Sequence, residues 1–149
     1  MTPVTLCLAS HDALAYSDFR DALESMSGNF RFLSLTAEFL ISKQSPPDPA
    51  VVIVDLSHSD FTGYQIIQFL RNSNLFLKTP IVVLSQTTNY RTQQTCWESG
   101  ADLYVVKPFL REDLIAILKH VATIDWSVRG RDKTQFLYVP KKPASHEHY

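Results

Sequence analysis

The chain has 149 residues, of which 45% are hydrophobic and 19% charged, which is enough for one domain with a substantial core. A formal net charge of −1 argues against a general nucleic-acid or membrane-surface binder. The apolar runs are no longer than strands, which excludes a membrane span, and the N-terminus does not resemble a signal peptide. The two cysteines, Cys7 and Cys96, lack metal-like spacing, so we expect reduced, buried thiols in a cytoplasmic protein.

The first half of the chain predicts three strands and two helices. Strands are expected over residues 4–9, 30–35 and 51–55. The first helix has apolar positions at helical spacing, namely Ala15, Phe19, Ala22, Leu23 and Met26, and should stop at Gly28. Thr36 can cap a short second helix. The third strand contains four β-branched residues in a row, which is typical of a strand buried on both faces, and it ends in Asp55.

The second half continues the alternation of strands and helices. Gly63 leads into a third helix, and Pro80 precedes a strand over residues 81–84. A fourth helix over residues 90–99 closes at Gly100, a fifth strand covers 102–106, and a fifth helix covers 111–122. Five strands alternating with five helices predict an α/β fold, a doubly wound parallel sheet with helices on both faces.

Three of the predicted strands end in polar side chains that could act together. Asp55 ends the third strand, and Ser85 and Lys107 follow the fourth and fifth strands. Parallel strands place their carboxyl ends at one edge of the sheet, where open α/β sheets hold their sites. A carboxylate, a hydroxyl and an ammonium group there suit phosphoryl chemistry. Taken singly, each has a simpler explanation: a cap, a turn residue and a solvated surface charge.

The segments that carry these residues resemble the receiver domain of two-component response regulators, especially the stand-alone chemotaxis type (CheY-like). The matching segments are VVIVDLS with Asp55, then Gly63, PIVVLS with Ser85, and GADLYVVKPF with Lys107. The resemblance covers about residues 4–121 and implies a flavodoxin-like five-stranded sheet in the order 2-1-3-4-5.

The resemblance also implies a function and roles for individual residues. A histidine kinase or phosphotransfer protein would phosphorylate Asp55, Lys107 would pair with the phosphoryl oxygens across a cis bond to Pro108, and Ser85 would donate a hydrogen bond. Tyr104 would move from exposed to buried and remodel the face made by helix four, strand five and helix five, where a downstream protein binds. Mg²⁺ would be held by Asp55 and the Ser57 backbone carbonyl. Beyond self-phosphorylation and slow autodephosphorylation, no enzyme activity is implied.

The end of the first strand departs from the family pattern. Receivers carry two consecutive acidic residues there, which hold Mg²⁺, whereas Ser10 and His11 occupy these positions here. The alternative register, which would make the pair His11 and Asp12, would bury Arg20 and Glu24 on the first helix and is disfavoured. Serine and imidazole are poor Mg²⁺ ligands. Asp12 could cap the first helix or reach the metal through water.

These departures leave alternatives to a phosphoacceptor. A pseudo-receiver would have the same fold and act as a protein-interaction module without Mg²⁺-dependent phosphorylation. His11 and His58, with Asp55, could hold a transition metal, or they are solvent-facing loop residues. A cofactor-binding flavodoxin-like module is disfavoured because no cobalamin-type motif or glycine-rich phosphate loop occurs.

The last part of the chain extends beyond the receiver. We expect a receiver domain over residues 1–122 and an extension over 123–149, too short for a DNA-binding output domain. Trp126 and residues 136–139 should fold back on the domain or pack across a homodimer, with a mobile end. Trp97 could form an exposed aromatic patch with Tyr90 and Tyr104, or pack under this extension.

Overall fold

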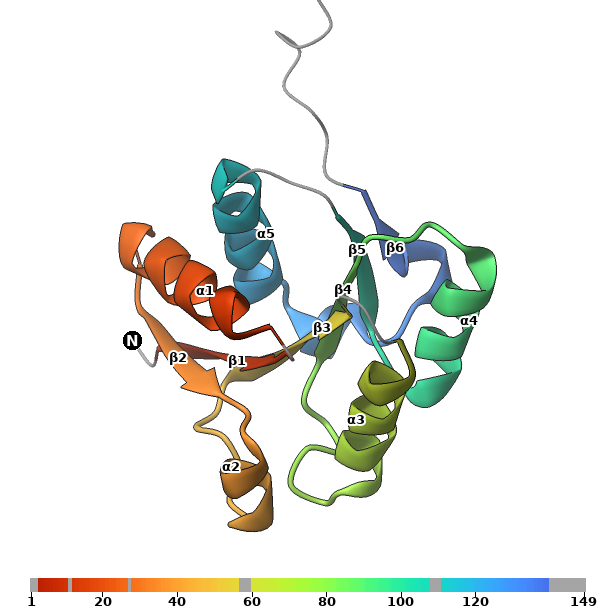
Figure 1. Cartoon of the computed structure of the whole chain (residues 1–149), viewed down its shortest axis with the longest axis horizontal. Helices are drawn as coiled ribbons and strands as arrows, with labels where there is room; N and C mark the ends of the chain where they lie inside the picture. The colour runs from red at the N-terminus through yellow and green to blue at the C-terminus, as the bar shows by residue number, and fades with distance from the viewer. Residues whose placement is uncertain (1–2, 11, 27, 57–59, 108–110, 140–149) are drawn as a thin grey trace, which may run out of the picture.

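The computed structural model describes residues 3–10, 12–26, 28–56, 60–107 and 111–139. Its centre is a parallel six-stranded sheet in the order β2-β1-β3-β4-β5-β6 (Figure 1). The strands are β1 (Val4–Ala9), β2 (Phe30–Ser34), β3 (Ala50–Leu56), β4 (Ile81–Ser85), β5 (Leu103–Val106) and β6 (Leu137–Tyr138). The predicted α/β flavodoxin-like sheet and its strand order are confirmed, with one more strand added at the β5 edge.

Helices cover both faces of the sheet. One face carries α1 (Ala13–Ser25) and α5 (Arg111–Thr123), and the other carries α2 (Ala37–Ile41), α3 (Asp60–Asn72) and α4 (Tyr90–Ser99) (Figure 1). After α5 the chain forms α6 (Trp126–Arg129) and a 3₁₀ turn (Lys133–Gln135) before β6. In the part of the chain that the structure describes, no helix has the length and apolarity to cross a bilayer.

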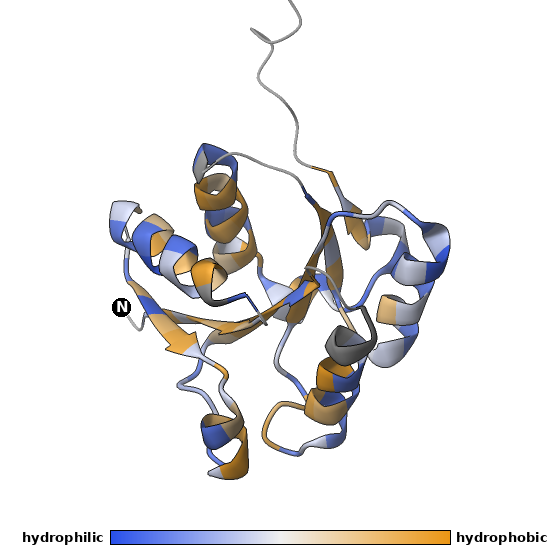
Figure 2. Cartoon of the chain, in the orientation of Figure 1, coloured by the Kyte–Doolittle hydropathy of each residue, from blue (hydrophilic) through white to orange (hydrophobic). Residues whose placement is uncertain are grey.

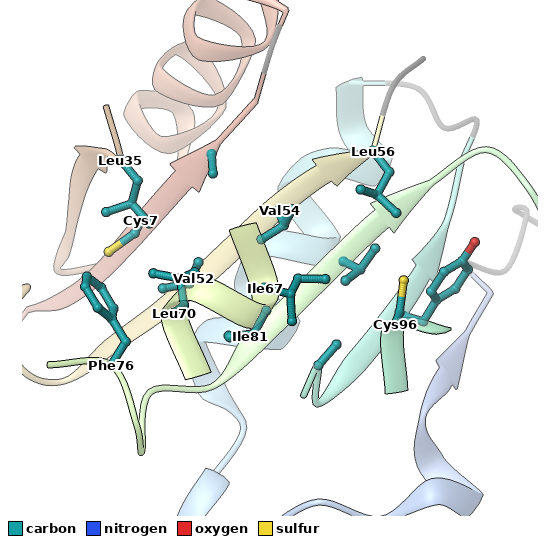
Figure 3. Close-up of a cluster of buried hydrophobic side chains, with 14 of the residues drawn as sticks. Cys7, Leu35, Val52, Val54, Leu56, Ile67, Leu70, Phe76, Ile81 and Cys96 are labelled. Atoms are coloured by element: carbon teal, nitrogen blue, oxygen red, sulfur yellow. The ribbon is translucent and has the colours of Figure 1, made fainter. Parts of the chain in front are cut away.

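The sheet has one hydrophobic core on each face because its strand side chains alternate between them. Every residue of β3 is buried, and Val52 and Val54 face α3 whereas Val51 and Ile53 face α1 and α5. Figure 3 shows the core on the face covered by α3 and α4, where side chains of the strands contact side chains of these two helices. The central strands are mostly hydrophobic, whereas the helices carry both hydrophobic and hydrophilic residues (Figure 2). The side chains predicted to line the inner face of α5, namely Leu114, Ile117, Leu118 and Val121, are all buried.

Polar residues fix the helix ends where the sequence indicates them. Thr36 and Asn89 accept backbone N–H groups at the start of α2 and α4, which satisfies donors that have no helical partner. Gly100 ends α4 with φ of 115°, and a Cβ atom there would collide with the side chain of Arg71. One helix differs from the expectation: α3 begins at Asp60, before Gly63, because a glycine is tolerated inside a helix at modest cost.

Candidate phosphoryl-acceptor site

Asp55 lies near the carboxyl end of β3, where its register pairs it with Leu84 of β4. Its side chain is buried, with only 6% of the residue exposed. The Lys107 ammonium group contacts Asp55 Oδ1 and forms an ion pair with it. Lys107 follows β5 directly, and its backbone N–H donates to the Ser85 carbonyl over 2.7 Å. The end of β4 therefore fixes the residue that supplies the positive charge.

Ser10 holds the second oxygen of the same carboxylate. Its hydroxyl donates to Asp55 Oδ2 over 3.0 Å and accepts the Asp12 backbone N–H over 3.1 Å. The Tyr16 hydroxyl contacts both backbone groups of Ser10: it accepts the N–H over 3.1 Å and donates to the carbonyl over 2.9 Å. Both Asp55 oxygens thus accept hydrogen bonds from side chains of this chain.

Ser85 and Tyr104 occupy the neighbouring strand ends. Ser85 is buried, and its Oγ accepts the Thr87 backbone N–H over 3.3 Å, which leaves its hydroxyl hydrogen for another acceptor. The Tyr104 hydroxyl donates to the Thr87 carbonyl over 2.7 Å, and the ring is fully buried. The loop that follows Ser85 therefore contacts Tyr104 directly.

The predicted exposed aromatic patch is wrong. Tyr90 is exposed, but Tyr104 is inaccessible and Trp97 is only partly exposed. Trp97 packs edge-on against Phe136, and the Arg131 guanidinium lies 3.9 Å from the centre of its indole. The alternative, in which Trp97 packs under the C-terminal extension, describes what the structure shows.

A pocket of about 240 Å³ opens beside Asp55. Its lining residues are Asp12, Ala15, Asp18, Phe19, Asp55, Leu84, Gln86, Lys107 and Leu114. Asp12, the residue that caps the N-terminus of α1, lies in the wall of this pocket. The rest of the wall combines charged side chains with apolar side chains that include those of α1 and α5. It opens onto the Asp55–Lys107 pair, with Asp12 and Asp18 adding negative charge to its wall.

The described residues do not fit the Mg²⁺ ion that receivers use. Mg²⁺ needs several oxygen ligands with electron pairs directed at the metal. Here both Asp55 oxygens instead accept hydrogens, Oδ2 from the Ser10 hydroxyl and Oδ1 from the Lys107 ammonium group. Asp12 is exposed, and its Oδ1 accepts the Leu14 N–H as the cap of α1. Among the residues that the structure describes, no group of three or more His, Cys, Asp or Glu could hold a metal. The structure does not describe His11, Ser57, His58 or Pro108, so the roles expected of these four residues stay predictions.

A family model for the response regulator receiver domain matches residues 15–119. This chain belongs to the response regulator receiver family. Among curated proteins, it is 28% identical to protein PilG of Pseudomonas aeruginosa over 79 residues, 53% of this chain and 58% of PilG. It is 37% identical to the transcriptional regulatory protein KdpE of Mycobacterium tuberculosis over 76 residues, 51% of this chain but 31% of KdpE. The matches thus span 58% of PilG and 31% of KdpE.

Solved structures agree with the fold. The chemotaxis response regulator CheY4 of Vibrio cholerae aligns with a TM-score of 0.63 and 22% identity, over 81% of this chain and 99% of CheY4. A response regulator structure from Chloroflexus aurantiacus aligns with a TM-score of 0.63 and 20% identity, over 83% of this chain and 100% of that protein. At these identities the alignments establish that the receiver has the CheY-like fold.

Sequence reasoning missed two features of this receiver site. The Tyr16 hydroxyl forms hydrogen bonds with both backbone groups of Ser10. The sequence shows only a tyrosine at a half-buried position of α1, and this pattern does not predict a contact with the preceding loop. The sequence predicts Ser10 to be a poor metal ligand, and it does not predict the hydrogen bond from Ser10 to Asp55. A hydroxyl placed where the family has a carboxylate opposite Asp55 was the signal available.

Proposed function

We propose that this receiver accepts a phosphoryl group on Asp55 and signals to another protein through the face formed by α4, β5 and α5. The ion pair between buried Asp55 and partly exposed Lys107 is the observation that carries this proposal. A carboxylate beside a fixed ammonium group can attack phosphorus, and the ammonium then balances the charge that the phosphoryl oxygens bring.

The proposed transfer involves the side chains on the described strand ends. One Asp55 oxygen forms a bond to phosphorus while the bond from phosphorus to the imidazole nitrogen of a phosphohistidine donor breaks. The donor imidazole leaves with the electron pair and takes a proton from solvent. Lys107 shifts from the carboxylate to the phosphoryl oxygens, and the Ser85 hydroxyl donates to one of them. A histidine kinase or a phosphotransfer protein supplies the donor, and a downstream protein is the recipient of the signal.

The Ser10 hydrogen bond to Asp55 supports a second candidate, a pseudo-receiver. A hydroxyl that donates to Oδ2 satisfies the carboxylate without a metal, so the site is stable as an acceptor of hydrogen bonds alone. In this role the α4–β5–α5 face would bind its partner independently of phosphorylation.

Mass spectrometry after incubation with acetyl phosphate, with Mg²⁺ and with EDTA, separates the two candidates. A phosphoacceptor gains one phosphoryl mass, loses it in Asp55→Asn, and keeps it in the matched control Asp21→Asn on the exposed side of α1. No mass gain with Mg²⁺ or with EDTA, together with Trp and Tyr fluorescence that beryllofluoride does not change, would exclude the phosphoacceptor and favour the pseudo-receiver.

A further inference from the structure

The chain after α5 returns to the sheet and occupies the outer edge of β5. Residues 125–138, which we call the C-terminal cover, include α6, the 3₁₀ turn and β6. The Tyr104 backbone N–H donates to the Phe136 carbonyl over 2.7 Å, and the register then pairs Tyr104 with Leu137 and Val105 with Tyr138. Figure 1 shows β6 alongside β5, next to α4. The edge where an outside strand could pair is filled by the chain itself.

Aromatic contacts place the C-terminal cover across all three elements of the α4–β5–α5 face. The Phe136 ring is 5% exposed, lies 5.2 Å from the Trp97 ring of α4 at 75°, and lies 6.0 Å from the Tyr104 ring of β5. The Tyr138 ring stacks on His120 of α5 at 4.8 Å. Phe136 therefore packs against Tyr104 on the side toward α4 and limits the space into which that ring could turn.

Two arginines tie the C-terminal cover to the loop between α4 and β5. Arg131 donates to the Ala101 carbonyl over 3.0 Å and also to that of Trp97. Arg129 donates to the Asp102 carbonyl over 3.2 Å and to the Gln135 carbonyl, within the cover, over 2.7 Å. Ala101 and Asp102 are buried residues, so the two arginines satisfy carbonyls that water would have to reach once the cover leaves.

The C-terminal cover has little buried surface of its own. Phe136 is its one buried residue among those that the structure describes, whereas Val128 is 82% and Leu137 45% exposed. Segments with few buried apolar contacts open at lower free energy than the whole domain. Because β6 has only two residues, Phe136 is the one side chain within residues 125–138 that this edge buries, beside the Tyr138–His120 stack and the two arginines.

We propose that the β5 edge is a strand-docking site for an extended peptide with an aromatic side chain, and that the C-terminal cover is its built-in occupant. A partner segment that pairs with β5 and inserts an aromatic ring between Trp97 and Tyr104 displaces the cover. This inference rests on the proposed use of the α4–β5–α5 face for signalling. In this proposal the C-terminal cover occupies the α4–β5–α5 face until a partner displaces it, and the displacement frees the space beside Tyr104.

Amide hydrogen exchange followed by NMR on the full chain tests the occupant. The Tyr104 amide reports on the cover, and the Val52 amide, which donates to the Pro80 carbonyl over 2.9 Å in the sheet centre, reports on the whole domain. In Phe136→Ala we expect Tyr104 exchange to rise about tenfold or more relative to Val52. Val128→Ala, a truncation at an exposed site of the same segment, should change neither. Arg131→Ala is a milder variant that should raise Tyr104 exchange by a smaller factor.

A peptide with the sequence of residues 131–139 tests the docking site. Added to Phe136→Ala, it should restore Tyr104 protection, whereas the same peptide with alanine in place of its phenylalanine should not. Tyr104 exchange that stays unchanged in Phe136→Ala and Arg131→Ala, or that rises in step with Val52, would overturn the proposal. So would equal protection by both peptides, or by neither. No phosphodonor is present, so failure here and failure of Asp55 phosphorylation are separate results.

Discussion

At the scale of single residues, Ser10 determines the chemistry of the site. A hydroxyl can donate to Asp55, whereas a carboxylate at the same place would repel it unless a cation lay between them. The Tyr16 hydroxyl fixes the Ser10 backbone from both sides, so the hydroxyl is held 3.0 Å from Oδ2. Ser10 therefore gives Asp55 a direct hydrogen bond at a place where a second carboxylate would need a cation.

Ser10→Asp should make the fold respond to Mg²⁺. Without metal, the second carboxylate beside Asp55 should lower the free energy of unfolding by about 1 to 2 kcal/mol, partly offset by Lys107. Millimolar Mg²⁺ should restore most of this loss in urea denaturation, and it should leave the wild type and Ser10→Asn unchanged. Equal stabilisation of the wild type by Mg²⁺ would show that the native residues already hold the ion.

At the scale of elements, Arg71 connects α3 to the starts of β4 and β5. Its guanidinium pairs with the Asp102 carboxylate, and it donates to the Gly100 carbonyl over 2.7 Å and the Thr79 carbonyl over 2.7 Å. Asp102 also accepts the Ile81 N–H over 2.8 Å. Burial raises the pKa of Asp102 despite these partners and lowers the pKa of Arg71. The pair thus fixes the edge of the sheet opposite the site.

Arg71→Met should destabilise the domain, and more at pH 7 than at pH 4.5. Removing one partner of a buried pair costs about 3 to 5 kcal/mol, because Asp102 stays buried with less compensation. A carboxyl whose folded-state pKa is raised favours the fold while it is protonated, and this contribution is lost as the pH rises through that pKa.

Urea denaturation at the two pH values measures the effect, with the wild type compared at each. Arg91→Met, at an exposed site on α4, is the matched control and should change little. A loss in Arg71→Met that is equal at both pH values would show that Asp102 does not carry the effect.

At the scale of the whole molecule, the sheet divides the interior into two cores that share the same strands. Cys7 and Cys96 lie in the core on the side of α3 and α4, are fully buried, and are not joined by a disulfide (Figure 3). Burial raises the pKa of the Cys7 thiol to about 12, so its reactive thiolate is scarce at neutral pH.

Both thiols should be inert toward an aromatic disulfide reagent in the folded protein and react when it unfolds. Cys7 lies in β1 and Cys96 in α4, and both belong to the core between the sheet and α3 and α4. Because this core opens only when the domain unfolds, we expect the labelling rate in increasing urea to follow the loss of circular dichroism. Fast reaction of either thiol in native buffer would contradict a core that opens only with the whole domain.

The sequence alone was enough for the local elements and for the family. Runs of β-branched residues around Val52 and Val82 have few alternatives to buried strands, and apolar spacing on the helices then requires two covered faces. Thr36 and Gly100 marked helix ends because capping depends on neighbours in the chain. The positions of Asp55, Ser85 and Lys107 at one sheet edge followed from parallel strands, and the structure places all three there.

Only the tertiary structure decided which groups meet. Ser10 and Asp55 are 45 positions apart and Lys107 is 52 beyond Asp55, so their contacts depend on how strands pair and not on local pattern. The sequence predicts that residues 136–139 fold back on the domain or pack across a dimer, but the two-residue strand beside β5 and the contacts of Phe136 with Trp97 and Tyr104 come only from the structure. Local composition determines elements because their energies are local, whereas the grouping of Ser10, Asp55 and Lys107 and the covered β5 edge arise from contacts between distant segments.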